Sequence, residues 1–201
     1  MEQKKKQTSG SMVYPRKGTL KRLVYKTPLF LWRTGMGPLM SHPLLRGSRM
    51  LCLTTLGRKS GQPRHTMLSY APACGKDYVC SGWGKDSDWV KNILQNPLVT
   101  VQVGRRTYTG KAYRVLDSDE FQTVAEEMFL RGGDSHFKPW LASYGISFDQ
   151  QDMIAKRNRL FIFGFQPIDK LGPAPLTADL QWIWLLLATL IMTIAGAVAI
   201  I

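Results

Sequence analysis

The order of the short strand-like segments constrains the fold of this chain more than any other feature. Six segments have the apolar or alternating pattern of β-strands, and turn-rich stretches separate them. These segments are residues 50–56, 67–70, 77–81, 98–103, 106–116 and 159–165. No βαβ repeat connects them, so a parallel sheet is not expected. We therefore predict an α+β fold in which helices surround an antiparallel, barrel-like sheet.

Three helices are expected around this sheet. The first is amphipathic and basic, covers residues 19–34, and is broken by Gly35 and the following Gly37-Pro38. A short helix begins near residues 86–87 and stops at Asn96-Pro97. A longer one covers residues 118–131, with Asp117 or Ser118 as its cap and Gly132-Gly133 as its end.

The last 22 residues, 180–201, contain no charged side chain. A helix needs ~20 mostly apolar residues to cross a bilayer, so this segment is predicted to be a transmembrane anchor, with a buried core helix as the alternative. Cations precede the segment and none follows it, which predicts a cytoplasmic domain on a membrane. The expected organisation is a basic flexible tail (1–18), the amphipathic helix (19–34), a globular domain (35–167), a proline-rich linker (168–179) and the anchor (180–201).

The formal net charge is +13, and the cations are concentrated at the N-terminus. Residues 1–26 hold eight Lys or Arg side chains against Glu2 alone. Such a block suits anionic lipid, nucleic acid or a polyanionic ligand. No nucleic-acid-binding signature accompanies it, so we expect membrane lipid as a partner and no nucleic acid.

One strand-to-strand connection carries the chemistry. Residues 54–64 read Thr-Thr-Leu-Gly-Arg-Lys-Ser-Gly-Gln-Pro-Arg and combine three cations, three hydroxyls and two glycines. Glycines let backbone N–H groups approach an anion, and Arg or Lys bind phosphate oxygens through charge-assisted hydrogen bonds. The pattern indicates a phosphate-binding turn, although a basic turn of this kind is also common as a solvated surface loop. It matches neither a Walker A loop nor a dinucleotide-binding fingerprint.

This segment resembles the signature of the deazaflavin-dependent nitroreductases, also called deazaflavin-dependent quinone reductases. The following block, Ser81-Gly82-Trp83-Gly84 through Asn96-Pro97, is similar to the next motif of that family, and the Val-x-Val-Gly-Arg-Arg-Thr-Tyr hairpin comes after it. The resemblance covers about residues 20–167. It implies a split β-barrel of the FMN-binding type and coenzyme F-420, an 8-hydroxy-5-deazaflavin with a phosphate and an oligoglutamate tail. FMN is the alternative cofactor.

The resemblance also implies roles for individual residues. Lys59 and Arg64 would hold the phosphate, and Arg58, Ser60 and Gly61 would shape the turn. The deazaflavin ring would meet the second motif, namely Ser81, Gly82, Trp83, Gly84 and, at its edge, Trp89. Trp89 is equally well explained as a core residue of its helix. Tyr144 and Ser81 are the candidate catalytic residues, and the histidines show no metal-binding spacing.

The function that the resemblance implies is hydride transfer. A reduced deazaflavin gives up hydride, so the expected enzyme is a reductase acting on a two-electron acceptor such as a quinone, enone or nitro compound. The predicted anchor favours a lipophilic acceptor. Two alternatives remain: an FMN-dependent oxidoreductase of the same fold, and a non-catalytic cofactor-binding or lipid-binding protein.

Overall fold

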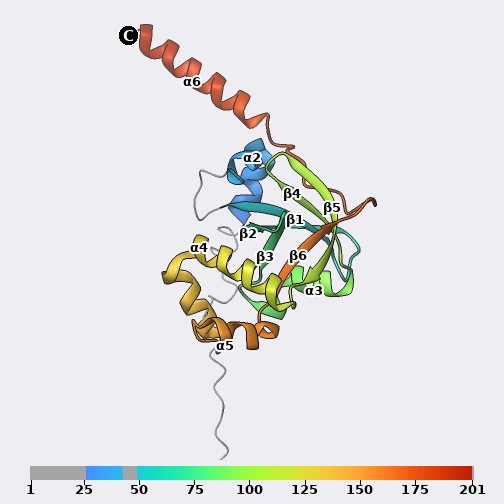
Figure 1. The fold of residues 1–201 in the computed structure, drawn as a ribbon. Helices are drawn as coiled ribbons and strands as arrows, with labels where there is room; N and C mark the ends of the chain where they lie inside the picture. Colours follow the sequence, from blue (N-terminus) through green and yellow to red (C-terminus); the bar gives the residue numbers. More distant parts are fainter. Residues whose placement is uncertain (1–25, 43–48, 201) are drawn as a thin grey trace, which may run out of the picture.

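Six antiparallel strands close into a barrel in the computed structural model of the chain, which describes residues 26–42 and 49–200, except for the side chains of 131–136 and 196–200 (Figure 1). Around the barrel the strand order is β1-β2-β3-β6-β5-β4. The strands are β1 (Met50–Leu56), β2 (Pro63–Ala73), β3 (Lys76–Cys80), β4 (Leu98–Val103), β5 (Arg106–Arg114) and β6 (Ile162–Pro167). The predicted α+β class and antiparallel barrel are confirmed.

Alternation along the strands separates the interior of the barrel from its outer face. Leu51 and Leu53 on β1 belong to the interior core, together with Val99, Val101 and Phe163 from other strands. Cys52 and Thr54, which alternate with these leucines and face outward, are also buried, because other parts of the chain cover the outer face. This outer covering is what shapes the candidate site.

Helices cover the barrel from several sides. The 3-10 turn η2 (Gly84–Asp86) and helix α3 (Asp88–Gln95) follow β3, and α4 (Ser118–Ser143), α5 (Gln150–Ala155) and the 3-10 turn η3 (Arg157–Arg159) lie between β5 and β6. A second apolar cluster joins α4 to the barrel, with Phe121, Val124 and Leu141 packed around Tyr78 and Ile162. The chain therefore has one core inside the barrel and one beneath α4.

Helix α4 is longer than predicted. It was expected to end at Gly132-Gly133, but it continues to Ser143. Tertiary packing explains the difference, because Phe137 and Leu141 bury their side chains in the second apolar cluster and thereby compensate for the poor helix propensity of two glycines. The sequence pattern also missed α5.

The N-terminal helical segment covers residues 26–40. Residues 26–31 are helical, a π-helical turn η1 (Trp32–Met36) follows, and α2 (Gly37–Met40) completes the segment. Gly35 has a φ of 89°, which kinks the helix at the position where the break was predicted. The predicted basic tail, 1–18, and residues 19–25 of the predicted helix lie outside the described residues.

Residues 172–177 lie across the outer face of the barrel as a strap. The Thr100 hydroxyl donates to the Pro173 carbonyl at 2.6 Å, and Gln102 both donates to and accepts from the backbone of Leu176, at 3.1 and 2.9 Å. The segment predicted as a linker, 168–179, is therefore in part a packed element.

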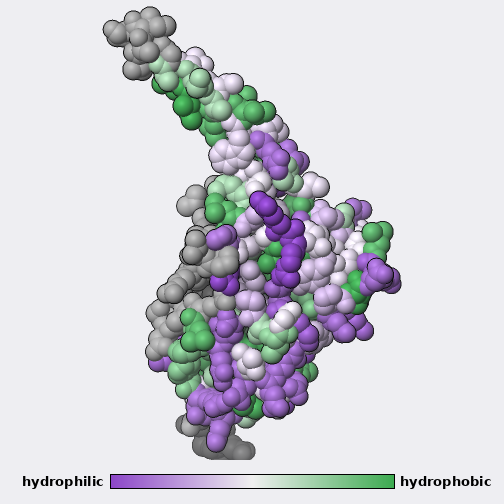
Figure 2. Space-filling view, turned by 45° about the horizontal axis from the view of Figure 1, so that its top comes forward, coloured by the Kyte–Doolittle hydropathy of each residue, from purple (hydrophilic) through white to green (hydrophobic). Residues whose placement is uncertain are grey.

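The uncharged segment predicted as an anchor, 180–201, contains helix α6 (Ile183–Ile200), which begins three residues later than the segment and has 18 residues. Within the described part of the chain, no helix has the length and apolar character needed to cross a membrane. The base of α6 is bound to the N-terminal segment, because Trp184 donates its indole N–H to the Thr34 carbonyl at 2.7 Å. Figure 2 shows hydrophobic side chains gathered along α6, where it projects from a more polar body.

Candidate active site

The basic connection between β1 and β2 folds into a closed turn at one rim of the barrel. The Gly57 N–H donates to the Gln62 carbonyl at 2.8 Å, and the N–H groups of Ser60 and Gly61 donate to the Gly57 carbonyl at 3.1 and 2.7 Å. Gly61 has a φ of +66°, and a Cβ on Gly57 would lie 2.8 Å from the Ser60 hydroxyl. Both glycines are therefore required by the turn itself.

The Arg58 side chain makes hydrogen bonds to residues of α3. Its guanidinium donates to the Asp88 carboxylate at 2.9 Å and to the side-chain oxygen of Asn92 at 3.2 Å. Asn92 is buried, also accepts the Arg58 backbone N–H, and donates to the Thr55 hydroxyl at 3.0 Å. Arg58 thus fixes the turn to α3, and its charge is balanced by a carboxylate.

Lys59 and Arg64 differ from Arg58 in this respect. Both side chains are exposed, and within the described residues neither contacts a carboxylate. Arg64 makes one hydrogen bond, from its guanidinium to the Ser60 hydroxyl at 3.3 Å. Two cations beside a closed glycine turn provide charge that nothing in the described structure neutralises. This arrangement fits a phosphate group.

The second motif forms a compact loop between β3 and α3. Ser81 is buried, and its hydroxyl lies 2.9 Å from the Gly84 carbonyl, to which it donates, and 2.7 Å from the Ser87 hydroxyl. Gly84 has a φ of +52°, in the left-handed region that favours glycine. The Ser81 side chain therefore holds the loop, and the exposed Gly82 and Trp83 present its outer surface.

Tyr144 is the predicted residue that the fold brings to this loop from furthest along the chain. Its hydroxyl lies 3.2 Å from the Gly82 carbonyl and 3.4 Å from the Ser81 carbonyl. The ring also packs against Trp140 at a centroid distance of 5.6 Å, within the range of about 4.5–7 Å that is usual for aromatic pairs. Tyr144 and Ser81, the two candidate catalytic residues, thus lie together.

The two tryptophans of the motif have different positions. Trp83 is 48% exposed, whereas Trp89 is 7% exposed and makes an edge-to-face contact with Phe163 at 5.5 Å. Trp89 is part of the interior core. The structure thus shows the core position for Trp89, and its predicted contact with a cofactor ring stays a prediction.

The start of α3 connects the two motif loops. Arg58 of the first loop binds Asp88, and the neighbouring Ser87 contacts Ser81 of the second loop. The two motif loops are therefore joined through the start of α3 at the same rim of the barrel.

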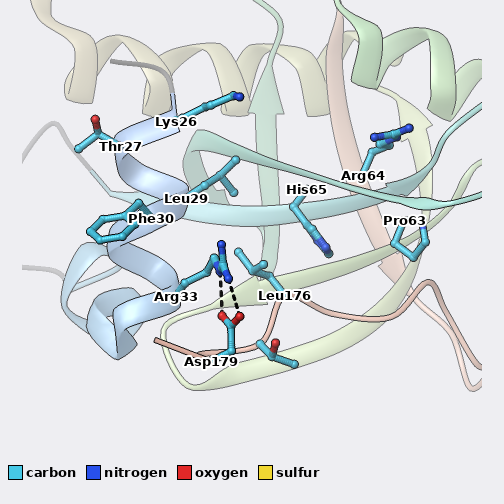
Figure 3. Close-up of a pocket in the computed structure, with 11 residues that line it drawn as sticks. Lys26, Thr27, Leu29, Phe30, Arg33, Pro63, Arg64, His65, Leu176 and Asp179 are labelled. Atoms are coloured by element: carbon cyan, nitrogen blue, oxygen red, sulfur yellow. Dashed lines mark hydrogen bonds and ion pairs between the residues drawn. The ribbon is translucent and has the colours of Figure 1, made fainter. Parts of the chain in front are cut away.

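A cavity of about 920 Å³ lies beside this rim, between the N-terminal helix, the start of β2 and residues 176–179 (Figure 3). Leu29, Phe30 and Leu176 contribute apolar surface. Arg33 and Asp179 form an ion pair across it, with Nε to Oδ1 at 2.8 Å. The N-terminal helical segment and residues 176–179 therefore form one wall of the cavity together.

Sequence reasoning missed His65, which lines this cavity from β2. Its Nδ1 lies 2.9 Å from the hydroxyl of Thr54, its partner across the β1–β2 pairing. Partial burial lowers the pKa of His65 below its usual value. The missed Asn92 had a signal in the sequence, since a polar residue three positions after Trp89 falls on the buried face of the same helix.

The fold and the site define an antiparallel-barrel protein with a basic glycine turn and an adjoining cavity at one rim of the barrel. The family model described as F420H(2)-dependent quinone reductase matches residues 33–130, which include both motif loops and β1 to β5. The chain is similar to this family over those 98 residues, which are just under half of its 201. This family uses reduced coenzyme F-420 as its cofactor.

Solved structures similar to the chain include the conserved hypothetical protein Rv2991 from Mycobacterium tuberculosis, with 16% identity over 64% of this chain and 86% of that one and a TM-score of 0.40. An F420-H2 dependent reductase named FDR-A has 20% identity over 58% and 93% of the two chains, with a TM-score of 0.36. The heme storage protein HutZ from Vibrio cholerae has 15% identity over 77% and 98%, with a TM-score of 0.42. No curated protein matches the chain.

Proposed function

We propose that this protein transfers hydride from reduced coenzyme F-420 to a lipophilic two-electron acceptor such as a quinone, an enone or a nitro compound. The observation that carries this proposal is the pair of exposed cations, Lys59 and Arg64, beside the glycine turn, where no carboxylate of the described residues neutralises them. An anionic cofactor supplies the missing negative charge. The family match supports coenzyme F-420 as that cofactor.

The proposed cofactor site uses both motif loops. Lys59 and Arg64 bind the phosphate, while Arg58, Ser60 and Gly61 keep the turn closed. The ring system lies against the second motif loop, where Gly82 and Trp83 are exposed and Gly84 follows them. When bound, the reduced deazaflavin supplies a hydride, that is, two electrons and one hydrogen nucleus together.

Tyr144 and Ser81 act on this site by holding its loop. The Tyr144 hydroxyl donates toward the carbonyls of Gly82 and Ser81, and the Ser81 hydroxyl crosses the loop to Gly84 and Ser87. Both hydroxyls therefore fix backbone groups that orient the ring, which is the positioning contribution that hydride transfer needs.

The lipophilic character of the acceptor is supported by the surface of α6. Leu185, Leu190, Ile191 and Met192 are each more than half exposed, as is Trp182 at the approach to the helix. Such a surface favours contact with lipid, in which apolar acceptors accumulate. We propose that lipid lies against this helix and brings apolar acceptors close to the domain.

The test is turnover of the purified full-length protein in lipid nanodiscs, followed as loss of reduced F-420. The expected result is oxidation of the cofactor with menadione as acceptor, faster than with a polar nitro compound of similar reduction potential. A protein that binds F-420 tightly but turns over no acceptor would be a carrier. A protein purified with FMN, and active with it alone, would contradict the proposed cofactor.

A further inference from the structure

The imidazole of His65 is the partly buried polar group in the cavity beside β2. It lies among the apolar side chains of Leu29, Phe30 and Leu176 and next to the Arg33–Asp179 ion pair. Figure 3 shows the ring extending from β2 toward the segment that carries Leu176. The other polar residues of the lining that are outside the ion pair are exposed, namely Lys26, Thr27, Arg64 and Thr177.

Thr54 determines which nitrogen of His65 carries the hydrogen. Thr54 is fully buried, and within the described residues its hydroxyl has one side-chain partner, Nδ1 of His65 at 2.9 Å. A buried hydroxyl that donates to no acceptor is costly, so the Thr54 O–H donates to Nδ1. Neutral His65 therefore carries its hydrogen on Nε2, the nitrogen on the far side of the ring from Thr54.

The position of His65 on β2 relates the cavity to the candidate cofactor site. Residues 65, 67 and 69 share the outer face of β2, because side chains alternate along a strand. Arg64, the residue before His65, belongs to the candidate phosphate site and also lines the cavity. A ligand in the cavity therefore lies next to the candidate cofactor site.

We propose that this cavity binds the hydride acceptor as an apolar carbonyl compound, and that the Nε2–H of His65 donates a hydrogen bond to its carbonyl oxygen. This rests on the proposed function. When the acceptor receives hydride from reduced F-420 at a conjugated carbon, the carbonyl π electrons move onto this oxygen. The Nε2–H bond stabilises the resulting negative charge, His65 keeps its hydrogen, and water supplies the proton that completes the product.

The tautomer can be measured without cofactor. Nitrogen-15 NMR of the imidazoles distinguishes a protonated from an unprotonated ring nitrogen, and His65→Gln identifies the His65 signals among those of the three histidines. At pH 7.5 the spectrum should show hydrogen on Nε2 and an unprotonated Nδ1 that accepts a hydrogen bond. Thr54→Val should lower the population of this tautomer, and Thr54→Ser should preserve it. Hydrogen on Nδ1 in the wild-type protein would overturn the proposal.

Ligand recognition is tested with two probes of nearly the same shape, menadione and 2-methylnaphthalene, of which only the first has carbonyl groups. The wild-type protein without cofactor should bind menadione about fivefold more tightly, as expected for one neutral hydrogen bond. His65→Leu should bring the ratio close to one, while His65→Gln, which retains an N–H donor, should preserve most of it. An unchanged ratio in His65→Leu would overturn the proposal.

The F-420 affinity of the same variants separates this proposal from the proposed function. His65→Leu is expected to bind F-420 as the wild-type protein does, because the phosphate site on Lys59 and Arg64 is intact. Failure of the wild-type protein to bind F-420 would refute the proposed function, whereas loss of the menadione preference with F-420 binding intact would refute only the role of His65.

Discussion

Three neighbouring cations of the β1–β2 turn have different surroundings, and these surroundings assign their roles. Arg58 is held by Asp88 and Asn92, whereas Lys59 and Arg64 are exposed and bind no carboxylate of the described residues. A cation that is paired with a carboxylate contributes mainly to the structure. A cation without such a partner can form a charge-assisted hydrogen bond with an anionic ligand.

Arg58→Ala is therefore predicted to affect stability more than Lys59→Ala. Loss of the hydrogen bonds to Asn92 and Asp88 should lower the free energy of unfolding by about 1–2 kcal/mol. Lys59→Ala should leave it within about 0.5 kcal/mol, as surface substitutions usually do. Urea denaturation of both variants measures the difference, and equal stabilities would show that Arg58 does not fix the turn to α3.

His65 is predicted to make the protein less stable in mild acid. Burial lowers its pKa in the folded state, while the unfolded chain has the ordinary value of about 6.5. The unfolded state therefore takes up this proton first, and stability declines as the pH falls below about 6.5 toward the lower, folded-state pKa. Above about pH 7 the group has no such effect. Thermal unfolding of wild-type protein and His65→Gln between pH 7.5 and 5 measures it, and parallel pH profiles would contradict the prediction.

At the scale of elements, α4 shows how local and tertiary signals combine. The Asp117 carboxylate accepts the backbone N–H groups of Asp119 and Glu120 at 3.1 and 2.9 Å and so caps the helix as predicted. The far end depends on burial in the second apolar cluster, and for this reason the glycine pair does not end the helix. A local pattern thus predicts the start of this helix but not its end.

Removal of the cap should be measurable by itself. Asp117→Ala is expected to lower the free energy of unfolding by about 1 kcal/mol, because two backbone N–H groups lose their acceptor. Asp117→Asn retains an acceptor oxygen and is expected to cost less. Chemical denaturation of the pair provides the comparison, and an alanine variant as stable as the asparagine variant would indicate that another group caps α4.

At the scale of the whole molecule, the C-terminal region has two parts with different roles. Residues 172–177 bind the outer face of the barrel through Thr100 and Gln102, whereas α6 projects from the domain and exposes apolar side chains. The strap belongs to the folded domain. The exposed helix is the part suited to contacts outside it.

Two truncations should separate these parts. Deletion of residues 183–201 is expected to leave the melting temperature of the barrel nearly unchanged and to reduce binding to detergent micelles. Deletion of residues 172–201 also removes the three hydrogen bonds of the strap and the Arg33–Asp179 ion pair and uncovers Thr100, and should cost about 2–4 kcal/mol more. If both truncated proteins unfold at the same temperature, the strap does not stabilise the barrel.

The barrel and the two motif loops could be predicted because their signals are local. β1 and β4 have the predicted bounds, and the cations and glycines of the basic turn are adjacent in the sequence. The cavity could not be predicted, because Arg33, His65 and Asp179 meet there through packing of segments far apart in the chain. The predicted C-terminal segment begins three residues before the helix that forms, because absence of charge does not mark where a helix starts.

A fluorescence titration of coenzyme F-420 into the purified protein, with FMN as the competing cofactor, tests whether the protein is an F-420-binding protein. We expect F-420 to bind more tightly than FMN. Lys59→Ala and Arg64→Ala should each lose ~1.5–3 kcal/mol of binding free energy, an effect that shrinks at high salt, while a folded Arg58→Lys variant loses less. Unchanged F-420 affinity in both alanine variants, or preferential binding of FMN, would contradict this expectation.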